Sequence, residues 1–253
     1  MLGGFLPDGL SAVAATILVI ASFFTSALTA AFGVGGGLAM LALMGVFVPV
    51  AQLIPVHGAV QLGSNAGRAW HQRAHVRMDI VMPFAAGSVV GAIAGVFVVI
   101  QLPDAVLKLV LGLFIIAITW ARLPKLEVVS RPLLTVASAG LALLGMFVGA
   151  TGPLLSAILA RFFADDRKAL VATHGAVMIS QHAFKLVVFA VAGFAFAAWA
   201  PLVLAMILSG YLGTIYGTTL LERMPEDLFR RWFRLGLTLL AVHMLWQAAS
   251  AAL

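Results

Sequence analysis

The sequence contains no cysteine and very few charged residues. The absence of cysteine excludes disulfides and thiolate metal sites. Charged residues make up 9% of the chain and hydrophobic residues 63%, whereas globular domains carry about 25% charged residues. The runs 9–32, 80–100 and 199–220 are long enough to cross a bilayer, which takes about 20 apolar residues. The composition therefore predicts a polytopic membrane protein without a soluble domain.

Acidic residues are also missing from the apolar runs. The nine acids all fall at a terminus, in a loop or at an expected helix end: Asp8, Asp79, Asp104, Glu127, Asp165, Asp166, Glu222, Glu226 and Asp227. A membrane-embedded enzyme would need a nucleophile–base pair or a metal cluster, and mid-helix carboxylates are absent. The glycine-rich stretches lack the spacing of a P-loop or dinucleotide motif. We expect no catalytic residue, no metal, no cofactor and no enzyme activity.

Apolar runs and helix breakers predict an all-α integral membrane protein with ten helical segments. Four in each half are long, and one is short and follows a glycine-rich break. The expected segments are 9–32, 37–48, 52–75, 80–100, 104–121, 132–148, 153–162, 168–192, 199–220 and 228–251.

The chain repeats itself. His57 and His174 each begin the tetrapeptide His-Gly-Ala-Val, and a cation follows eleven residues later, Arg68 in one copy and Lys185 in the other. Glycine pairs also recur and are interpreted as helix packing: Gly91 and Gly95, Gly213 and Gly217. Shared order and landmarks indicate an internal duplication. The first transmembrane repeat is 1–121, the second is 132–253, and the cytoplasmic link 122–131 joins them into one membrane domain.

Lysine and arginine are distributed unevenly along the chain. Twelve of the fifteen lie in four segments: 73–79, 122–131, 161–168 and 222–234. The positive-inside rule places all four in the cytoplasm. This requires an odd number of crossings per half, so the repeats are inverted and both termini lie outside. In the alternative, each half crosses the membrane four times, and the short helices enter the membrane without crossing it. The repeats are then parallel, and the four basic segments no longer all lie on the cytoplasmic side.

Arg68 and Lys185 lie within apolar segments, with no acid at mid-helix to pair with either. A cation at the centre of a membrane helix costs about 2.5–3.5 kcal/mol on insertion scales. A mobile anion would offset that cost. The alternative is snorkelling to the interface or pairing with a carbonyl, and snorkelling is the stronger alternative for Arg68.

The polar residues around these cations share helix faces. His57, Gln61, Ser64 and Arg68 follow helical spacing, with Asn65 beside them. In the second half the face comprises His174, Met178, Gln181 and Lys185, with His182 beside them. Such faces line a substrate pathway or make interhelical hydrogen bonds. A histidine here could also titrate near neutral pH and couple transport to protons.

Two glycine-rich breaks complete the candidate site. Exposed N–H groups at a helix N-terminus attract anions, and glycine allows close approach of a ligand. The alternative is close helix packing. The candidate residues are Gly33, Gly35, Gly36, Gly37, Gly149, Thr151 and Gly152.

The motifs FGVGGGLAM (32–40), PVHGAVQLGSNAGRAWHQR (55–73), GSVVGAIAG (87–95) and GATGPLLSAIL (149–159) resemble the TauE/SafE family of sulfite exporters. The resemblance extends over the whole chain, although the second glycine motif contains fewer glycines and includes Thr151 and Pro153. It implies a bacterial inner-membrane protein that exports sulfite, thiosulfate or organosulfonates such as sulfoacetate and isethionate. It transfers no residue-level assignment to this chain.

Together these features predict a secondary transporter for small sulfur-containing anions, working by alternating access around a cationic site at the membrane midplane. An anion channel is the alternative, and a membrane-embedded enzyme is the weaker one. The expected partners are a small anionic substrate and the lipid bilayer, but no nucleic acid. The sequence does not decide whether a proton or another ion is coupled to transport, or whether the protein forms a homo-oligomer.

Overall fold

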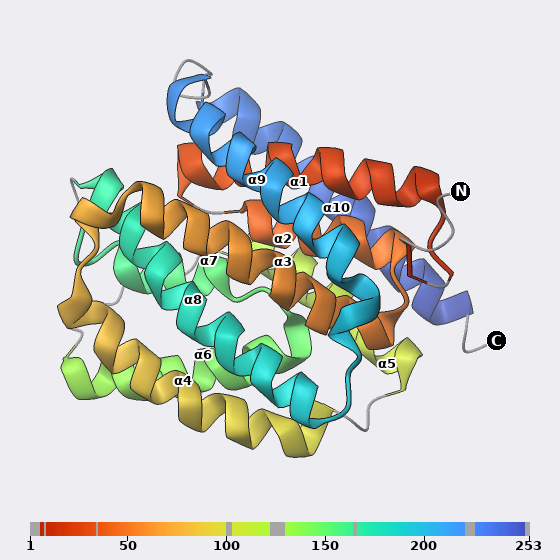
Figure 1. The fold of residues 1–253 in the computed structure, drawn as a ribbon, viewed down its shortest axis with the longest axis horizontal. Coiled ribbons are helices and arrows are strands. Elements are labelled where there is room, and N and C mark those ends of the chain that lie inside the picture. Colours follow the sequence, from red (N-terminus) through yellow and green to blue (C-terminus); the bar gives the residue numbers. More distant parts are fainter. Residues whose placement is uncertain are drawn as a thin grey trace.

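The computed structural model describes residues 6–7, 9–33, 35–99, 103–121, 130–163, 166–220 and 226–250. Every regular element in these ranges is a helix (Figure 1). The α-helices are α1 (Ala12–Phe32), α2 (Gly36–Phe47), α3 (Val50–His71), α4 (Met78–Val99), α5 (Asp104–Trp120), α6 (Arg131–Val148), α7 (Gly152–Leu159), α8 (Arg167–Val191), α9 (Ala200–Leu220) and α10 (Glu226–Ser250). Short 3₁₀ turns are η1 (Arg73–His75) and η2 (Phe196–Trp199).

The all-helical class, the order of the segments and the two breaks are confirmed.

Several helices begin where a polar side chain caps the first turn: Ser11 accepts from the Ala14 N–H, and Asp166 from the Ala169 N–H. The main boundary difference is at the end of α3, which stops at His71. The residues expected to continue it form η1 instead.

The two breaks occur where glycine adopts a left-handed backbone. Gly33 has φ 80°, Gly35 φ 105° and Gly149 φ 73°. Residues with a side chain rarely adopt positive φ angles of this size. Glycine can adopt them, so the chain can leave one helix and begin the next within three residues. The breaks separate α1 from α2 and α6 from α7.

In the part of the chain that the structure describes, four helical stretches are long and apolar enough to cross a membrane by length and composition: Ala12–Phe32, Met78–Gly95, Arg167–Val191 and Phe196–Gly217. The helix α3 has enough residues but is too polar to be among them, because it carries His57, Gln61, Asn65 and Arg68. Large apolar side chains are exposed on the outer surface, among them Phe24, Val90 and Leu208. Such a surface suits a lipid environment. The chain is a multi-pass membrane protein.

The helices pack mainly in pairs. α1 packs on α9, α4 on α6, α3 on α8 and α5 on α10. Figure 1 shows α3 and α8 in the middle, between the α1–α9 pair and the α4–α6 pair. If the halves correspond as predicted, the α1–α9 pair matches the α6–α4 pair, and the other two pairs each join equivalent helices.

Three of the four paired glycines, Gly91, Gly213 and Gly217, lie where helix backbones meet. A Cβ at Gly91 would collide with the backbone carbonyl of Ala139 on α6, and a Cβ at Gly213 with that of Phe23 on α1. Only glycine permits this approach, so the interpretation of these residues as packing positions is confirmed.

Contacts along α3 and α8 show that these two helices run antiparallel. Near the start of α3, a Cβ at Gly58 would lie 3.2 Å from Cδ of Lys185, late in α8. Near the end of α3, the Asn65 carbonyl and Ala69 lie against Gly175, early in α8.

Several predicted features lie outside the described residues. These are most of the link, at 122–129, and the start of the basic segment 222–234, at 222–225. The orientation of the repeats in a membrane and the two-repeat division stay predictions.

Candidate functional site

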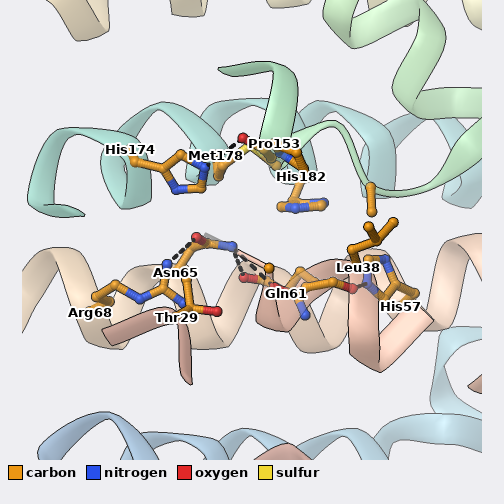
Figure 2. A pocket seen from close by; sticks show the side chains of 14 residues that line it. Thr29, Leu38, His57, Gln61, Asn65, Arg68, Pro153, His174, Met178 and His182 are labelled. Carbon is orange, nitrogen blue, oxygen red and sulfur yellow. Dashed lines mark hydrogen bonds between the residues drawn. The ribbon is translucent and has the colours of Figure 1, made fainter. Parts of the chain in front are cut away.

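A cavity lies between α3 and α8, next to both glycine breaks. The space between its lining atoms, including space open to solvent, is about 350 Å³. Figure 2 shows side chains from the two helices facing each other across it. α3 contributes His57, Gln61, Asn65 and Arg68, α8 contributes His174, Met178 and His182, and the breaks contribute Gly35, Gly37, Ala150, Gly152 and Pro153. Thr29 from α1 and Leu38 from α2 complete the lining.

Arg68 is the cation in this lining. Its side chain is 1% exposed, so it does not snorkel out of the bundle. Nη1 donates to Oδ1 of Asn65 at 3.1 Å, while Nε is buried without a partner. No acidic side chain in the described ranges pairs with it. The guanidinium is therefore buried with most of its donors unused.

Asn65 and Gln61 extend the polar row along α3. Nδ2 of Asn65 donates to the Gln61 carbonyl at 2.7 Å. This contact turns the Asn65 oxygen toward Arg68, so the amide holds the guanidinium in place. The carboxamide of Gln61 lies beside Gly37, at 3.2 Å from where a Cβ would be.

Lys185 occupies the equivalent sequence position but has a different environment. It is also buried, and Nζ donates to the Gly149 carbonyl at 2.9 Å. Lys185 is not part of the cavity lining. Pairing with a carbonyl was one of the alternatives that the sequence left open for the two cations, and the structure shows it for Lys185.

The two repeated histidines make equivalent contacts. Nε2 of His57 lies 2.9 Å from the Gly37 carbonyl, and Nε2 of His174 lies 3.2 Å from the Gly152 carbonyl. Each histidine thus ties the glycine break of its own half to a long central helix. Nδ1 of each ring is buried without a hydrogen-bond partner.

His182 completes the group of histidines. Its ring centroid lies 6.2 Å from that of His57, in an edge-to-face arrangement. In Figure 2 it stands opposite Gln61, while His174 stands opposite Asn65.

Other predicted site residues lie outside the cavity lining. Ser64 bonds to Ser26 of α1 at 3.0 Å, and Thr151 donates to Gln181 at 3.2 Å. Both contacts join helices, which was the alternative interpretation. A Cβ at Gly36 would collide with the Thr25 carbonyl, so this glycine packs against α1. Gly33 and Gly149 shape the breaks through their backbone angles.

Some lining residues were not singled out from the sequence. Thr29 is a polar residue one turn before the first break, and that position was its only signal. Leu38, Ala150 and Pro153 are apolar residues next to the breaks, so composition gave no sign of them. Met178 lies on the predicted face of α8 but is not polar.

Among the acidic side chains that the structure describes, none lines the cavity. Asp79 pairs with Arg77 at 2.7 Å at the exposed start of α4. The hydrogen bond and charge of Asp79 raise the pKa of Arg77. The cavity therefore combines an unneutralised cation, amide groups and an α2 N-terminus whose N-cap, Gly35, makes no side-chain cap. All of these suit an anion.

Comparison with known proteins gives one family. The family model described as sulfite exporter TauE/SafE matches residues 18–244, nearly the whole chain. Neither the curated proteins nor the solved structures contain a match.

Proposed function

The chain belongs to the TauE/SafE sulfite exporter family, and on that premise we propose that it is a secondary transporter that exports small sulfur-containing anions by alternating access. Family membership implies an anion exporter. The anion site, the substrate and the mechanism are our proposals.

One observation carries the proposed site: the buried guanidinium of Arg68 has no acidic partner among the described residues. A buried charge without compensation is costly, and a bound oxyanion would remove that cost. Sulfite and sulfonates present several oxygen acceptors, which match the fork of guanidinium donors. Gln61 and the first N–H groups of α2 would bind the remaining oxygens.

Lys185 has a supporting role in this proposal. Its ammonium is already occupied by the Gly149 carbonyl. It holds the second break in position and adds positive charge near the cavity. Arg68 is the cation that contacts the anion.

The packing of equivalent helices supports alternating access. α3 and α8 run antiparallel, which is the arrangement expected of equivalent helices in inverted repeats. α5 and α10 also run antiparallel, since Gly112 lies against Leu245 while Trp120 bonds to Thr238. Inverted repeats with broken helices around a central site are a recurring transporter design.

A channel and an enzyme are distinguishable from a transporter by experiment. Flux that does not saturate with substrate indicates a channel. Chemical conversion of the substrate in detergent, without compartments, indicates an enzyme.

The anion site is tested by thermal stabilisation of the purified protein with sulfite, sulfate, thiosulfate, sulfoacetate, isethionate, taurine, phosphate and chloride. A ligand at 100 times its Kd stabilises the folded state by about 2.7 kcal/mol. We expect a shift with sulfur oxyanions for wild type, none for Arg68→Met, and a retained shift for Lys185→Met. Lys108→Met, which removes a cation of α5 outside the cavity lining, is the matched control.

A shift that survives in Arg68→Met would overturn the assignment of Arg68. The same result in both Arg68→Met and Lys185→Met would move the site to the glycine backbone.

A further inference from the structure

Three histidine rings line a cavity proposed to hold an anion: His57, His174 and His182. A carbonyl oxygen only accepts hydrogen bonds. Nε2 of His57 and of His174 must therefore carry the hydrogen that each donates to its glycine carbonyl. In a neutral ring the other nitrogen, Nδ1, then has a lone pair, and in both rings that atom is buried without a partner.

His182 has even fewer contacts. It is 1% exposed, its Nδ1 is buried without a hydrogen-bond partner, and no hydrogen bond to Nε2 is found in the part of the chain that the structure describes. A buried polar side chain without a partner is unusual, because a lost hydrogen bond in the interior is costly. The protein alone does not account for the polar atoms of His182.

An anion conflicts with neutral rings of this kind. The oxygens of an anion accept hydrogen bonds, and the unprotonated nitrogens of neutral imidazoles also accept them. No hydrogen bond can therefore form between the anion and these nitrogens. A protonated ring is a donor at both nitrogens and adds positive charge. A bound anion would also offset the positive charge of the nearby Arg68 and Lys185.

The charged and titratable neighbours of His182 are few. From α3 they are His57 and Arg68, and from α8 itself His174 and Lys185. α6 and α7 carry none beside it, since Arg131 begins α6 at its far end. Arg73 and His75 of η1 and Asp79 of α4 are exposed near the start of α8, where Arg77 N–H bonds to Thr173.

We propose that the site takes up one proton together with its anion, and that the His182 ring receives it. The inference rests on the proposed anion site and adds a proton that binds there together with the anion. His182 is favoured over His57 and His174 because it has no competing hydrogen bond and lies among the other rings and Lys185. Since binding of the two ions is linked, each strengthens binding of the other.

The test measures protons taken up per anion bound, by calorimetry of purified wild type at one pH in buffers with different ionisation enthalpies. The probes are isethionate, thiosulfate and sulfate, which do not titrate near neutral pH, so any proton comes to the protein. A parallel series follows Kd against pH. We expect about one proton per anion and a Kd that rises up to about tenfold per pH unit.

The variants locate the proton. His182→Gln, which keeps a polar side chain without the titrating ring, should bind anion with no proton uptake and a nearly flat pH profile. His243→Gln, on α10 outside the cavity lining, should behave like wild type. If His182→Gln does not fold, the wild-type proton count still decides whether a proton binds.

The outcomes separate the two proposals. Wild type that binds anion without proton uptake overturns this inference and leaves the anion site intact. Proton uptake that persists in folded His182→Gln overturns the choice of His182. If none of the anions in the wider panel binds, the proposed function fails, and this inference fails with it.

Discussion

Arg68 and Lys185 are equivalent in the sequence repeat but differ in their partners. Arg68 has a neutral amide as its partner and lines the cavity, whereas Lys185 donates to a backbone carbonyl outside it. The first arrangement leaves donors for a ligand, and the second uses a cation to hold the chain. In our proposal the duplicated position therefore serves anion binding in one half and positioning of the glycine break in the other.

This difference predicts opposite effects on the ligand-free protein. Arg68→Met removes a buried charge that has no acidic partner, so we expect unchanged or higher stability. Lys185→Met leaves the Gly149 carbonyl without its donor, and we expect a loss of about 1–3 kcal/mol. Thermal unfolding in detergent without added anion measures both. Greater destabilisation by Arg68→Met than by Lys185→Met would make Arg68 a structural residue.

At the scale of the helix, glycine acts in two distinct ways. Gly33, Gly35 and Gly149 have positive φ and end or begin helices. Gly91 and Gly213 lie within helices and allow backbones to touch. The sequence distinguished these roles by spacing: clustered glycines marked breaks, and glycines four residues apart marked packing seams.

The packing role predicts the effect of a single methyl group. Gly91→Ala would push α4 from α6, because its Cβ meets the Ala139 carbonyl. We expect a loss of about 1–3 kcal/mol, typical of overpacking. Gly140→Ala on α6 is the matched control, since its Cβ would meet nothing within 4 Å. Equal unfolding midpoints for the two variants would contradict the close contact between α4 and α6.

In the whole molecule α3 and α8 pack on each other at the centre, while α1 packs on α9 and α4 packs on α6. The predicted inverted arrangement would place residues 73–79 in the cytoplasm and 193–198 outside, together with both termini. With parallel repeats these two segments would lie on the same side of the membrane.

The natural absence of cysteine makes this orientation directly testable. Ala74→Cys in η1 and Ala195→Cys just before η2 are matched substitutions at exposed alanines. In intact bacterial cells an impermeant maleimide should label Ala195→Cys at once and Ala74→Cys only after lysis. Labelling of both in intact cells would contradict the inverted topology.

The sequence predicted the class, the ten segments, the breaks and the family, because hydrophobic runs and glycine clusters are local signals. It also predicted His57, Gln61, Asn65, Arg68, His174 and His182, all of which line the cavity. It did not distinguish Arg68 from Lys185, or Asn65 from Ser64. Those differences depend on which neighbouring helix each side chain meets, and helical spacing carries no information about that.

Arg68 is proposed to bind the anion that the protein transports. The most direct measurement is counterflow of labelled thiosulfate or isethionate into proteoliposomes loaded with the unlabelled anion. We expect saturable accumulation with wild type and Lys108→Met, and none with Arg68→Met although it folds. Equal counterflow with Arg68→Met would contradict the account, and flux that never saturates would indicate a channel.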